Sequence, residues 1–206
     1  MPKSIDFSLY LITDRHQVAA GQSLVSAVDA ALRGGVRAMQ LREKDLPARE
    51  LLPLAEELRV LTRRHHARLL INDRIDVALA VEADGVHLGE HSLPVATARK
   101  LLGPQRTIGV STHSLADIAA ATEGGADFVT FGPVFATPSK AAYGAPVGLA
   151  ALRQACRQTA LPVFALGGIK SGHRQVIAGT GAAGIALISA IIAAADPTTA
   201  ARSFLA

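Results

Sequence analysis

Three polar residues at alternating positions, Gln40, Arg42 and Lys44, have the chemistry to bind an anion together. Gln40 and Arg42 belong to an apolar run, residues 36–42, that is typical of a β-strand, and Lys44 follows it. Residues two apart on a strand point to the same side, so an amide and two cations would face one space. A solvated strand end is the alternative explanation for any single Arg or Lys. All three side chains on one side favour an anion site.

Oxygen ligands follow the next strand-like run, residues 67–72, where Asn72 is succeeded by Asp73. By itself such a pair often marks only a turn or a helix cap. Opposite a cationic wall it becomes a candidate for holding Mg²⁺ on phosphate oxygens. Magnesium typically takes one or two protein carboxylates, together with water and substrate phosphate. The stretch "VHLGEHSLP", residues 86–94, adds three polar residues at a strand end: Glu90, His91 and Ser92.

A second candidate anion site lies later in the chain. Gly168 and the pair Ile188–Ser189 follow two further apolar runs. At such positions in many barrels, backbone N–H groups and a helix N-terminus bind phosphate. Thr137 and Ser139, in a loop rich in Gly and Pro, could donate hydroxyl groups, although turn chemistry is their alternative role. Two anion sites would suit a reaction that joins two phosphorylated molecules, and no nucleophile–base pair stands out.

The elements that would position these residues alternate between strand-like and helical patterns. The candidate strands are apolar throughout, as parallel strands covered on both faces should be. Between them lie amphipathic helices, such as the stripe formed by residues 24, 27, 28, 31 and 32, which has Ser23 as a plausible cap. The candidate strands are residues 8–13, 36–42, 67–72, 84–89, 106–111, 127–132, 161–167 and 183–189.

Eight strand–helix units in 206 residues predict an α/β protein with a single-domain (β/α)8 TIM barrel spanning residues 1–206. A doubly wound open sheet is the alternative. That fold usually carries a Gly-rich fingerprint after its first strand, and "LITDRHQ" has none. No linker or change of composition indicates a second domain.

Composition narrows the function class. The net charge is +4, but the basic residues are scattered and no aromatic platform accompanies them, so we expect no nucleic acid partner. The single cysteine, Cys156, excludes an internal disulfide and a thiolate zinc cluster. No apolar run reaches the ~18 residues of a membrane span, and no apolar signal core opens the chain. We therefore expect a cytoplasmic protein without a membrane partner, for which homo-oligomerisation is left open.

The motifs resemble those of the thiamine phosphate synthase/TenI superfamily along nearly the whole chain. The residues that carry this resemblance are "QLREK", "INDR", "ADGVHLG", "GVSTHS", "GADFVTFGPVFATPSK", "ALGGI" and "ISA". Synthases of this family join hydroxymethylpyrimidine pyrophosphate to thiazole phosphate, and Mg²⁺ assists the departure of pyrophosphate. The resemblance therefore implies a transferase of thiamine biosynthesis with two phosphorylated small-molecule substrates, Mg²⁺ as cofactor, and the barrel fold already predicted.

By this resemblance, the site residues act on the reacting groups, bind the metal or hold one of the two substrates. Arg42, Lys44, Ser111 and Lys140 would act on the reacting groups, and Asp73 would bind Mg²⁺. The pyrimidine pyrophosphate would lie against Gln40, Leu41, Arg42, Glu43, Lys44, Asn72, Ser111 and Lys140. The thiazole phosphate would lie against Thr137, Pro138, Ser139, Gly168, Ile188 and Ser189.

One departure from the family pattern concerns the metal. The synthases usually carry a second magnesium carboxylate where this chain has Ser92, and Glu90 is a candidate substitute. The tautomerase branch of the superfamily instead uses a histidine, matched here by His113, as an acid/base on a thiazole carboxylate phosphate. A non-catalytic, ligand-binding regulator on the same barrel is a third hypothesis. The combined set of Gln40, Arg42, Lys44, Asn72, Asp73 and Lys140 favours the synthase, because that set is hard to explain without a pyrophosphate.

Overall fold

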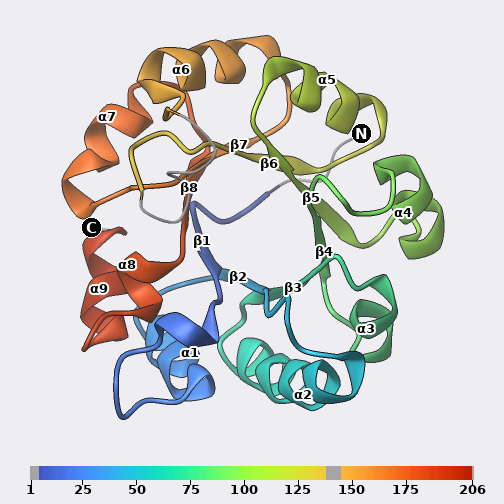
Figure 1. Cartoon of the computed structure of the whole chain (residues 1–206), viewed down its shortest axis with the longest axis vertical. Helices are drawn as coiled ribbons and strands as arrows, with labels where there is room; N and C mark the ends of the chain where they lie inside the picture. Colours follow the sequence, from blue (N-terminus) through green and yellow to red (C-terminus); the bar gives the residue numbers. More distant parts are fainter. Residues whose placement is uncertain (1–4, 138–144, 206) are drawn as a thin grey trace.

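The protein is a closed barrel of eight parallel strands in the order β1 to β8, each paired with its neighbours along the chain. The computed structural model describes residues 5–137 and 145–205. Helices form a ring around the strands, as the view down the barrel shows (Figure 1). The strands are β1 Leu9–Ile12, β2 Ala38–Leu41, β3 Arg68–Asn72, β4 Gly85–Leu88, β5 Thr107–Thr112, β6 Phe128–Phe131, β7 Val163–Leu166 and β8 Gly184–Leu187.

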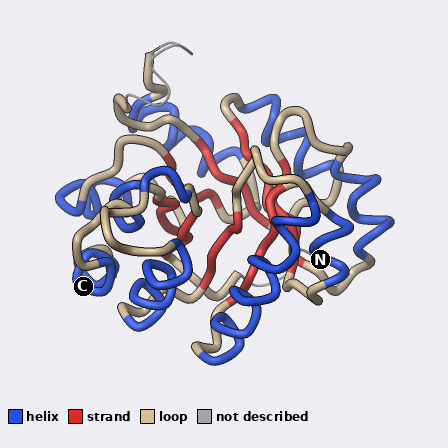
Figure 2. Tube along the Cα trace, turned by 60° about the horizontal axis from the view of Figure 1, so that its bottom comes forward, coloured by secondary structure: helices blue, strands red, loops and turns tan. Residues whose placement is uncertain are grey.

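Helices follow the strands and cover their outer face, so strands lie inside and helices outside in Figure 2. The α-helices are α1 Leu24–Arg33, α2 Ala48–Arg64, α3 Ile75–Ala80, α4 Val95–Leu102, α5 Leu115–Glu123, α6 Gly148–Gln158, α7 Arg174–Ala178, α8 Ser189–Ile192 and α9 Pro197–Ser203. The 3₁₀ turns of the described residues, η1 Arg15–Gln17 and η3 Ser171–His173, lie in loops after strands. The predicted barrel class is therefore confirmed. Among the described residues, none of the helices has the length and apolar character of a membrane span.

Alternation along each strand divides the core into two layers. Leu9, Leu11, Met39 and Leu41 belong to the outer layer, where they pack with helix residues such as Ala27. The strand residues of opposite parity fill the barrel itself. Tyr10, Ala38, Leu70, Phe128, Phe164 and Ala186 form this inner cluster, with Phe7 and Ile12.

Aromatic rings occupy most of the barrel interior. Phe128 makes edge-to-face contacts with Tyr10 and with Phe164, at ring-centroid distances of 5.4 Å in both cases. Gly109 on β5 makes room for this packing. A Cβ atom there would lie 2.4 Å from the Phe128 ring and 2.6 Å from Nδ1 of His87. The interior is thus packed to the point where even one methyl group has no space.

Two carboxylates, one buried and one half-buried, hold the amino ends of the strands together. Asp127, just before β6, accepts hydrogen bonds from the Arg99 guanidinium at 2.6 Å and from the Ile108 N–H at 2.8 Å. Asp84, before β4, repeats the arrangement with Arg59 and the Leu69 N–H. This end of a (β/α)8 barrel usually serves stability rather than chemistry.

Replacing Asp127 with Ala should therefore unfold the barrel more easily without altering the mouth. The substitution leaves Arg99 and the Ile108 N–H without their shared acceptor, and the expected loss is about 3 kcal/mol of unfolding free energy. Denaturant unfolding measures it. Asp6→Ala is the matched control, because the Asp6 side chain is 63% exposed in its pair with Arg68, and that change should cost less than about 1 kcal/mol. Equal losses in the two variants would contradict this assignment.

Candidate active site

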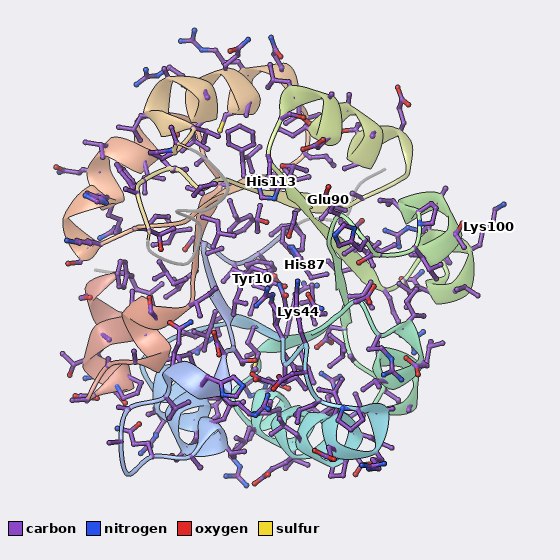
Figure 3. All side chains as sticks on the ribbon, in the orientation of Figure 1. Tyr10, Lys44, His87, Glu90, Lys100 and His113 are labelled. Carbon is purple, nitrogen blue, oxygen red and sulfur yellow. The ribbon has the colours of Figure 1, made fainter. Side chains whose placement is uncertain are left out.

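The polar residues of β2 divide according to strand parity. Gln40 points into the barrel, is 1% exposed, and donates from Nε2 to the Tyr10 Oη at 3.2 Å. Arg42 follows the strand and is half-buried, and its backbone N–H donates to Thr13 Oγ1 at 2.8 Å. Lys44 lies toward the barrel axis (Figure 3). The predicted cationic side of the mouth is therefore formed by residues of matching parity.

Leu41 and Glu43 have the opposite parity and point away from the mouth. Leu41 is buried in the layer between barrel and helices. The Glu43 carboxylate is buried and accepts hydrogen bonds from Thr13 Oγ1 at 2.6 Å and from Arg15 Nη1 at 3.2 Å. The side chains of these two predicted ligand residues are thus occupied in packing and in an ion pair. Only their backbones are left to contact a ligand.

Arg15 also ties the loop after β1 to the loop after β2. Its guanidinium pairs with both oxygens of Asp45, at 2.6 and 2.5 Å. The hydrogen bonds from Arg15 hold the pKa of the Asp45 carboxyl below its usual range. Asp14 in the same turn accepts a hydrogen bond from Gln17 Nε2 at 2.5 Å. These contacts fix the turn η1 at the rim of the mouth.

The candidate metal residues lie on the neighbouring side of the mouth. Asp73 follows β3 with a positive φ of 62° and an exposed side chain, and its N–H donates to the His87 carbonyl at 2.9 Å. Ser92 Oγ accepts the Gly89 N–H at 2.8 Å and so closes the turn after β4. Glu90 is exposed on the inner side of the helical ring, whereas Lys100 lies outside it (Figure 3). Within the described residues, no three His, Cys, Asp or Glu side chains cluster as metal ligands.

A buried histidine forms the floor of the mouth. His87 Nε2 lies 3.0 Å from Ser111 Oγ, and His87 Nδ1 lies 3.4 Å from Tyr10 Oη. Burial, and then the nearby charge of Arg42, lower the pKa of His87 to about 3, so the imidazole is neutral. Asn72, at the end of β3, is the Cα partner of His87 in the ladder. Ser111 and Asn72 were predicted from the sequence, whereas Tyr10 and His87 were missed.

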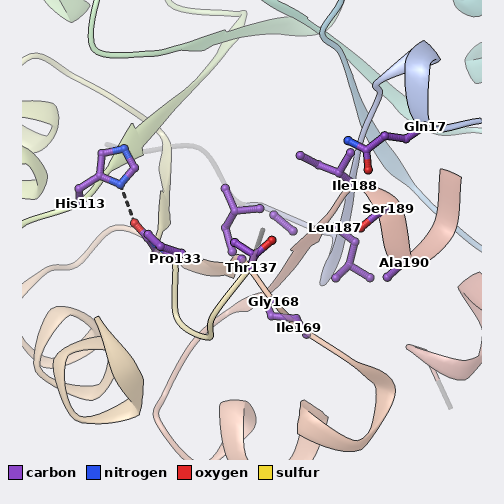
Figure 4. A pocket seen from close by; sticks show the side chains of 14 residues that line it. Gln17, His113, Pro133, Thr137, Gly168, Ile169, Leu187, Ile188, Ser189 and Ala190 are labelled. Atoms are coloured by element: carbon purple, nitrogen blue, oxygen red, sulfur yellow. Dashed lines mark hydrogen bonds between the residues drawn. The ribbon is translucent and has the colours of Figure 1, made fainter. Parts of the chain in front are cut away.

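Across the mouth, a pocket of about 130 Å³ opens between the ends of β5 to β8 (Figure 4). Five predicted residues line it together: His113, Thr137, Gly168, Ile188 and Ser189. Gln17 also lines it and was missed, because it lies in the turn η1, well beyond the end of β1. Pro138, Ser139 and Lys140 lie outside the described residues.

Backbone N–H groups are among the polar atoms of this pocket. The N–H groups of Ser189 and Ala190, at the start of α8, have no acceptor among the described residues, as is usual for a first helical turn. His113 donates from Nδ1 to the Gly132 carbonyl at 2.5 Å, which leaves Nε2 as its remaining polar atom (Figure 4). The pocket therefore offers N–H donors and hydroxyls that suit a phosphate, with one imidazole at its edge.

Comparisons with known proteins agree on one family. The family model described as thiamine monophosphate synthase matches residues 9–191. A protein of Geobacter sulfurreducens, named provisionally as a thiamine-phosphate synthase, is 61% identical over 98% of this chain and 94% of its own. The thiamine-phosphate synthase of Roseiflexus castenholzii is 45% identical over 95% of this chain and 85% of its own.

Solved structures extend this result. The thiamine phosphate pyrophosphorylase from Pyrococcus furiosus superposes with a TM-score of 0.87 at 38% identity, over 96% of this chain and 93% of that one. The 3-hexulose-6-phosphate synthase from Salmonella typhimurium reaches a TM-score of 0.70 at 19% identity, over 96% of each chain. The second likeness shows the barrel fold alone.

The backbone of Gly168 generates a prediction about the pocket wall. Gly168 has a φ of +65°, and a Cβ atom there would lie 2.5 Å from the Ala136 carbonyl oxygen. Gly168→Ala should therefore lower stability by about 1–3 kcal/mol through strain and displacement of the loop after β6. Thermal unfolding measures this loss. Gly172→Ala is the control, because a Cβ atom at Gly172 meets nothing within 4 Å. A Gly168 variant as stable as the control would show that the loop does not pack as described.

Proposed function

Since this chain belongs to the thiamine monophosphate synthase family, we propose that it joins hydroxymethylpyrimidine pyrophosphate to thiazole phosphate and releases pyrophosphate. The product is thiamine phosphate, and the protein is a transferase. One observation supports this most strongly: a cationic side of the barrel mouth and an N–H-rich pocket face the same opening. A reaction between two phosphorylated molecules needs such a pair of anion sites.

The pyrimidine pyrophosphate would bind on the side formed by β2 to β5. Arg42 and Lys44 supply positive charge there, and Gln40, Asn72 and Ser111 supply hydrogen bonds around the ring and the leaving group. Lys140, which lies outside the described residues, is proposed as a further cation on the family pattern. Charge placed where a leaving group gains negative charge stabilises the transition state more than the ground state.

The thiazole phosphate would bind in the pocket at β6 to β8. The N–H groups of Ser189 and Ala190 and the hydroxyl of Thr137 suit its phosphate, and Gly168 and Ile188 line the same wall. Pro138 and Ser139 are proposed to complete this side on the family pattern. The thiazole ring would then extend from the pocket toward the centre of the mouth, where the pyrimidine lies.

The chemistry requires no nucleophilic side chain. The bond between the pyrimidine methylene carbon and the pyrophosphate oxygen breaks, and its electron pair leaves with pyrophosphate. The lone pair of the thiazole nitrogen then forms the new carbon–nitrogen bond to the methylene cation. The protein holds both partners in line and stabilises the departing charge. His87, the one fully buried imidazole described, is neutral and therefore adds no positive charge beside the methylene cation.

The described mouth fits a magnesium ion bound largely by substrate. Asp73 has an exposed carboxylate that makes no hydrogen bond or ion pair with another described residue. Such a hard oxygen ligand, with water and phosphate oxygens, matches the preference of Mg²⁺. When bound, the ion would neutralise charge on the leaving pyrophosphate. Glu90 is a candidate second ligand, while the Ser92 hydroxyl is already engaged by the Gly89 N–H.

A second candidate function is supported by His113. This residue lines the phosphate pocket with Nε2 uncommitted, as an acid/base on a thiazole carboxylate phosphate would need. Isomerisation that disappears in His113→Ala, without any pyrophosphate release by the wild type, would select the tautomerase. A non-catalytic regulator has only the missing carboxylate at Ser92 in its favour.

The cytoplasm is the proposed compartment, in keeping with a single cysteine.

The pyrophosphate assignment predicts a large effect of one cation. Arg42→Ala should lower turnover by about 10²-fold or more, because it removes a charge that acts on the leaving group. Pyrophosphate release measures the rate. Arg37→Ala is the matched control, since Arg37 precedes β2 at the opposite end of the barrel and donates to the Leu32 carbonyl. Near-normal turnover in Arg42→Ala, or an equal loss in the control, would refute the assignment.

The metal assignment predicts a variant that needs less Mg²⁺. Ser92→Asp should lower the Mg²⁺ concentration needed for half-maximal rate several-fold, because it adds a carboxylate to the site. Ser92→Asn is the control, since it keeps an acceptor for the Gly89 N–H without adding charge. A raised magnesium requirement in Glu90→Ala would show that Glu90 already contributes. Full activity in EDTA, or equal shifts in the Asp and Asn variants, would disprove the magnesium role.

A further inference from the structure

A continuous chain of four polar side chains crosses the barrel beneath the mouth. Gln40 Nε2 lies 3.2 Å from Tyr10 Oη, which lies 3.4 Å from His87 Nδ1, and His87 Nε2 lies 3.0 Å from Ser111 Oγ. The chain connects β2 to β5 through β1 and β4. Its neighbours in the barrel are otherwise largely apolar and aromatic. A polar path through such an interior is costly unless each member is paired.

The hydrogen-bonding capacity of each group gives this chain a direction. The Gln40 amide nitrogen can only donate, so Tyr10 Oη is the acceptor. His87 Nδ1, when unprotonated, accepts the single Tyr10 hydrogen, whereas the opposite tautomer would leave that buried hydrogen without an acceptor among the described residues. A neutral imidazole with a bare Nδ1 carries its hydrogen on Nε2, and that hydrogen points to Ser111 Oγ. The Ser111 hydroxyl accepts this bond and keeps its own hydrogen.

Packing makes the arrangement rigid. Tyr10 is 0% and His87 2% exposed. Both rings pack against Phe128, with centroid distances of 5.4 Å and 5.7 Å. Burial keeps the pKa of the His87 imidazole far below neutrality and raises that of the Tyr10 phenol, so neither group changes protonation near neutral pH. No water is needed to satisfy the pair, because each atom has a side-chain partner.

The Ser111 hydrogen is not used by its neighbour across the ladder. Thr130 on β6 is the Cα partner of Ser111, and its buried Oγ1 has no hydrogen-bond partner among the described residues. Ser111 itself is half-buried, unlike the rest of the chain. The free donor of the chain therefore lies on Ser111, the most exposed of the four side chains.

We propose that Tyr10 and His87 are positioning residues, which orient the Ser111 hydroxyl as a hydrogen-bond donor to an acceptor atom of the pyrimidine pyrophosphate. This inference rests on the proposed function and extends it. The same bonds turn one amide N–H of Gln40 inward, which leaves its Oε1 as an acceptor for the substrate. Tyr10 and His87 do not touch the reacting atoms. They fix a pattern in which Ser111 on β5 donates a hydrogen bond to the substrate and Gln40 on β2 accepts one from it.

Double-mutant kinetics tests the coupling. We expect Ser111→Ala to lower kcat/KM for the pyrimidine pyrophosphate by about 10²-fold, and His87→Leu to lower it by a similar factor through misplacement of the hydroxyl. The double variant should be no slower than Ser111→Ala within about 2-fold, because both changes remove one donor. The KM for thiazole phosphate should stay unchanged. Multiplied losses in the double variant would overturn the proposal.

Two further variants separate positioning from packing. His87→Gln can restore an N–H toward Ser111, and we expect it to recover about 10-fold over His87→Leu. Phe128→Leu is the matched control, because Phe128 contacts the same two rings without a hydrogen bond. Its effect should multiply with that of Ser111→Ala instead of merging with it. No rescue by Gln, or a Phe128 variant that behaves like His87→Leu, would show a purely structural role.

The histidine tautomer gives a test that needs no substrate. Nitrogen-15 NMR of the free wild-type protein should show His87 protonated on Nε2 and bare on Nδ1. Tyr10→Phe keeps the ring and removes only the hydroxyl, so it should shift the Nδ1 resonance of a folded protein. A wild-type His87 protonated on Nδ1 would overturn the inference even if the enzyme is active. An inactive wild type with the expected tautomer would instead contradict the proposed function alone.

Discussion

Strand parity is the constraint on which the arrangement of the mouth depends. Inward positions of the eight strands must share one narrow space, and outward positions must pack under helices. This is why Gln40 and Arg42 belong to the mouth while Leu41 and Glu43, their neighbours in sequence, support it from outside. The Glu43–Arg15–Asp45 contacts hold the rim loop that carries Gln17. A single-residue shift of β2 would exchange the two sets.

The proposed chemistry depends mainly on electrostatic stabilisation, and the described site holds charged and polar groups that can provide it. Fixed N–H donors lie on one side, cations lie on the other, and a neutral histidine lies beneath them. Groups that are already oriented need not reorganise as charge develops, so their stabilisation acts fully in the transition state. Magnesium would add to this charge only when substrate supplies most of its ligands. The carboxylate missing at Ser92 therefore concerns affinity for the ion more than the geometry of the mouth.

The sequence predicted the strands and the residues just beyond them, because periodicity and strand ends are local features. It missed Tyr10 and His87, although both have the inward parity of a barrel strand. Their partnership joins residues 77 apart in sequence, and only the closed barrel brings them together. Glu43 was assigned from the family motif as part of a contiguous segment, whereas its side chain has the wrong parity for the mouth. For Pro138, Ser139 and Lys140 the assignment stays a prediction.

The central claim is that one mouth binds two phosphorylated substrates and joins them. Phosphorus-31 NMR of the purified protein with both substrates and Mg²⁺ tests it most directly, because substrate and product phosphates are followed in one sample. The account predicts that thiamine phosphate and pyrophosphate appear in equal amounts. Without thiazole phosphate the reaction cannot turn over, so neither product should form. Pyrophosphate without thiamine phosphate in the complete mixture, or no change in either substrate, would contradict it.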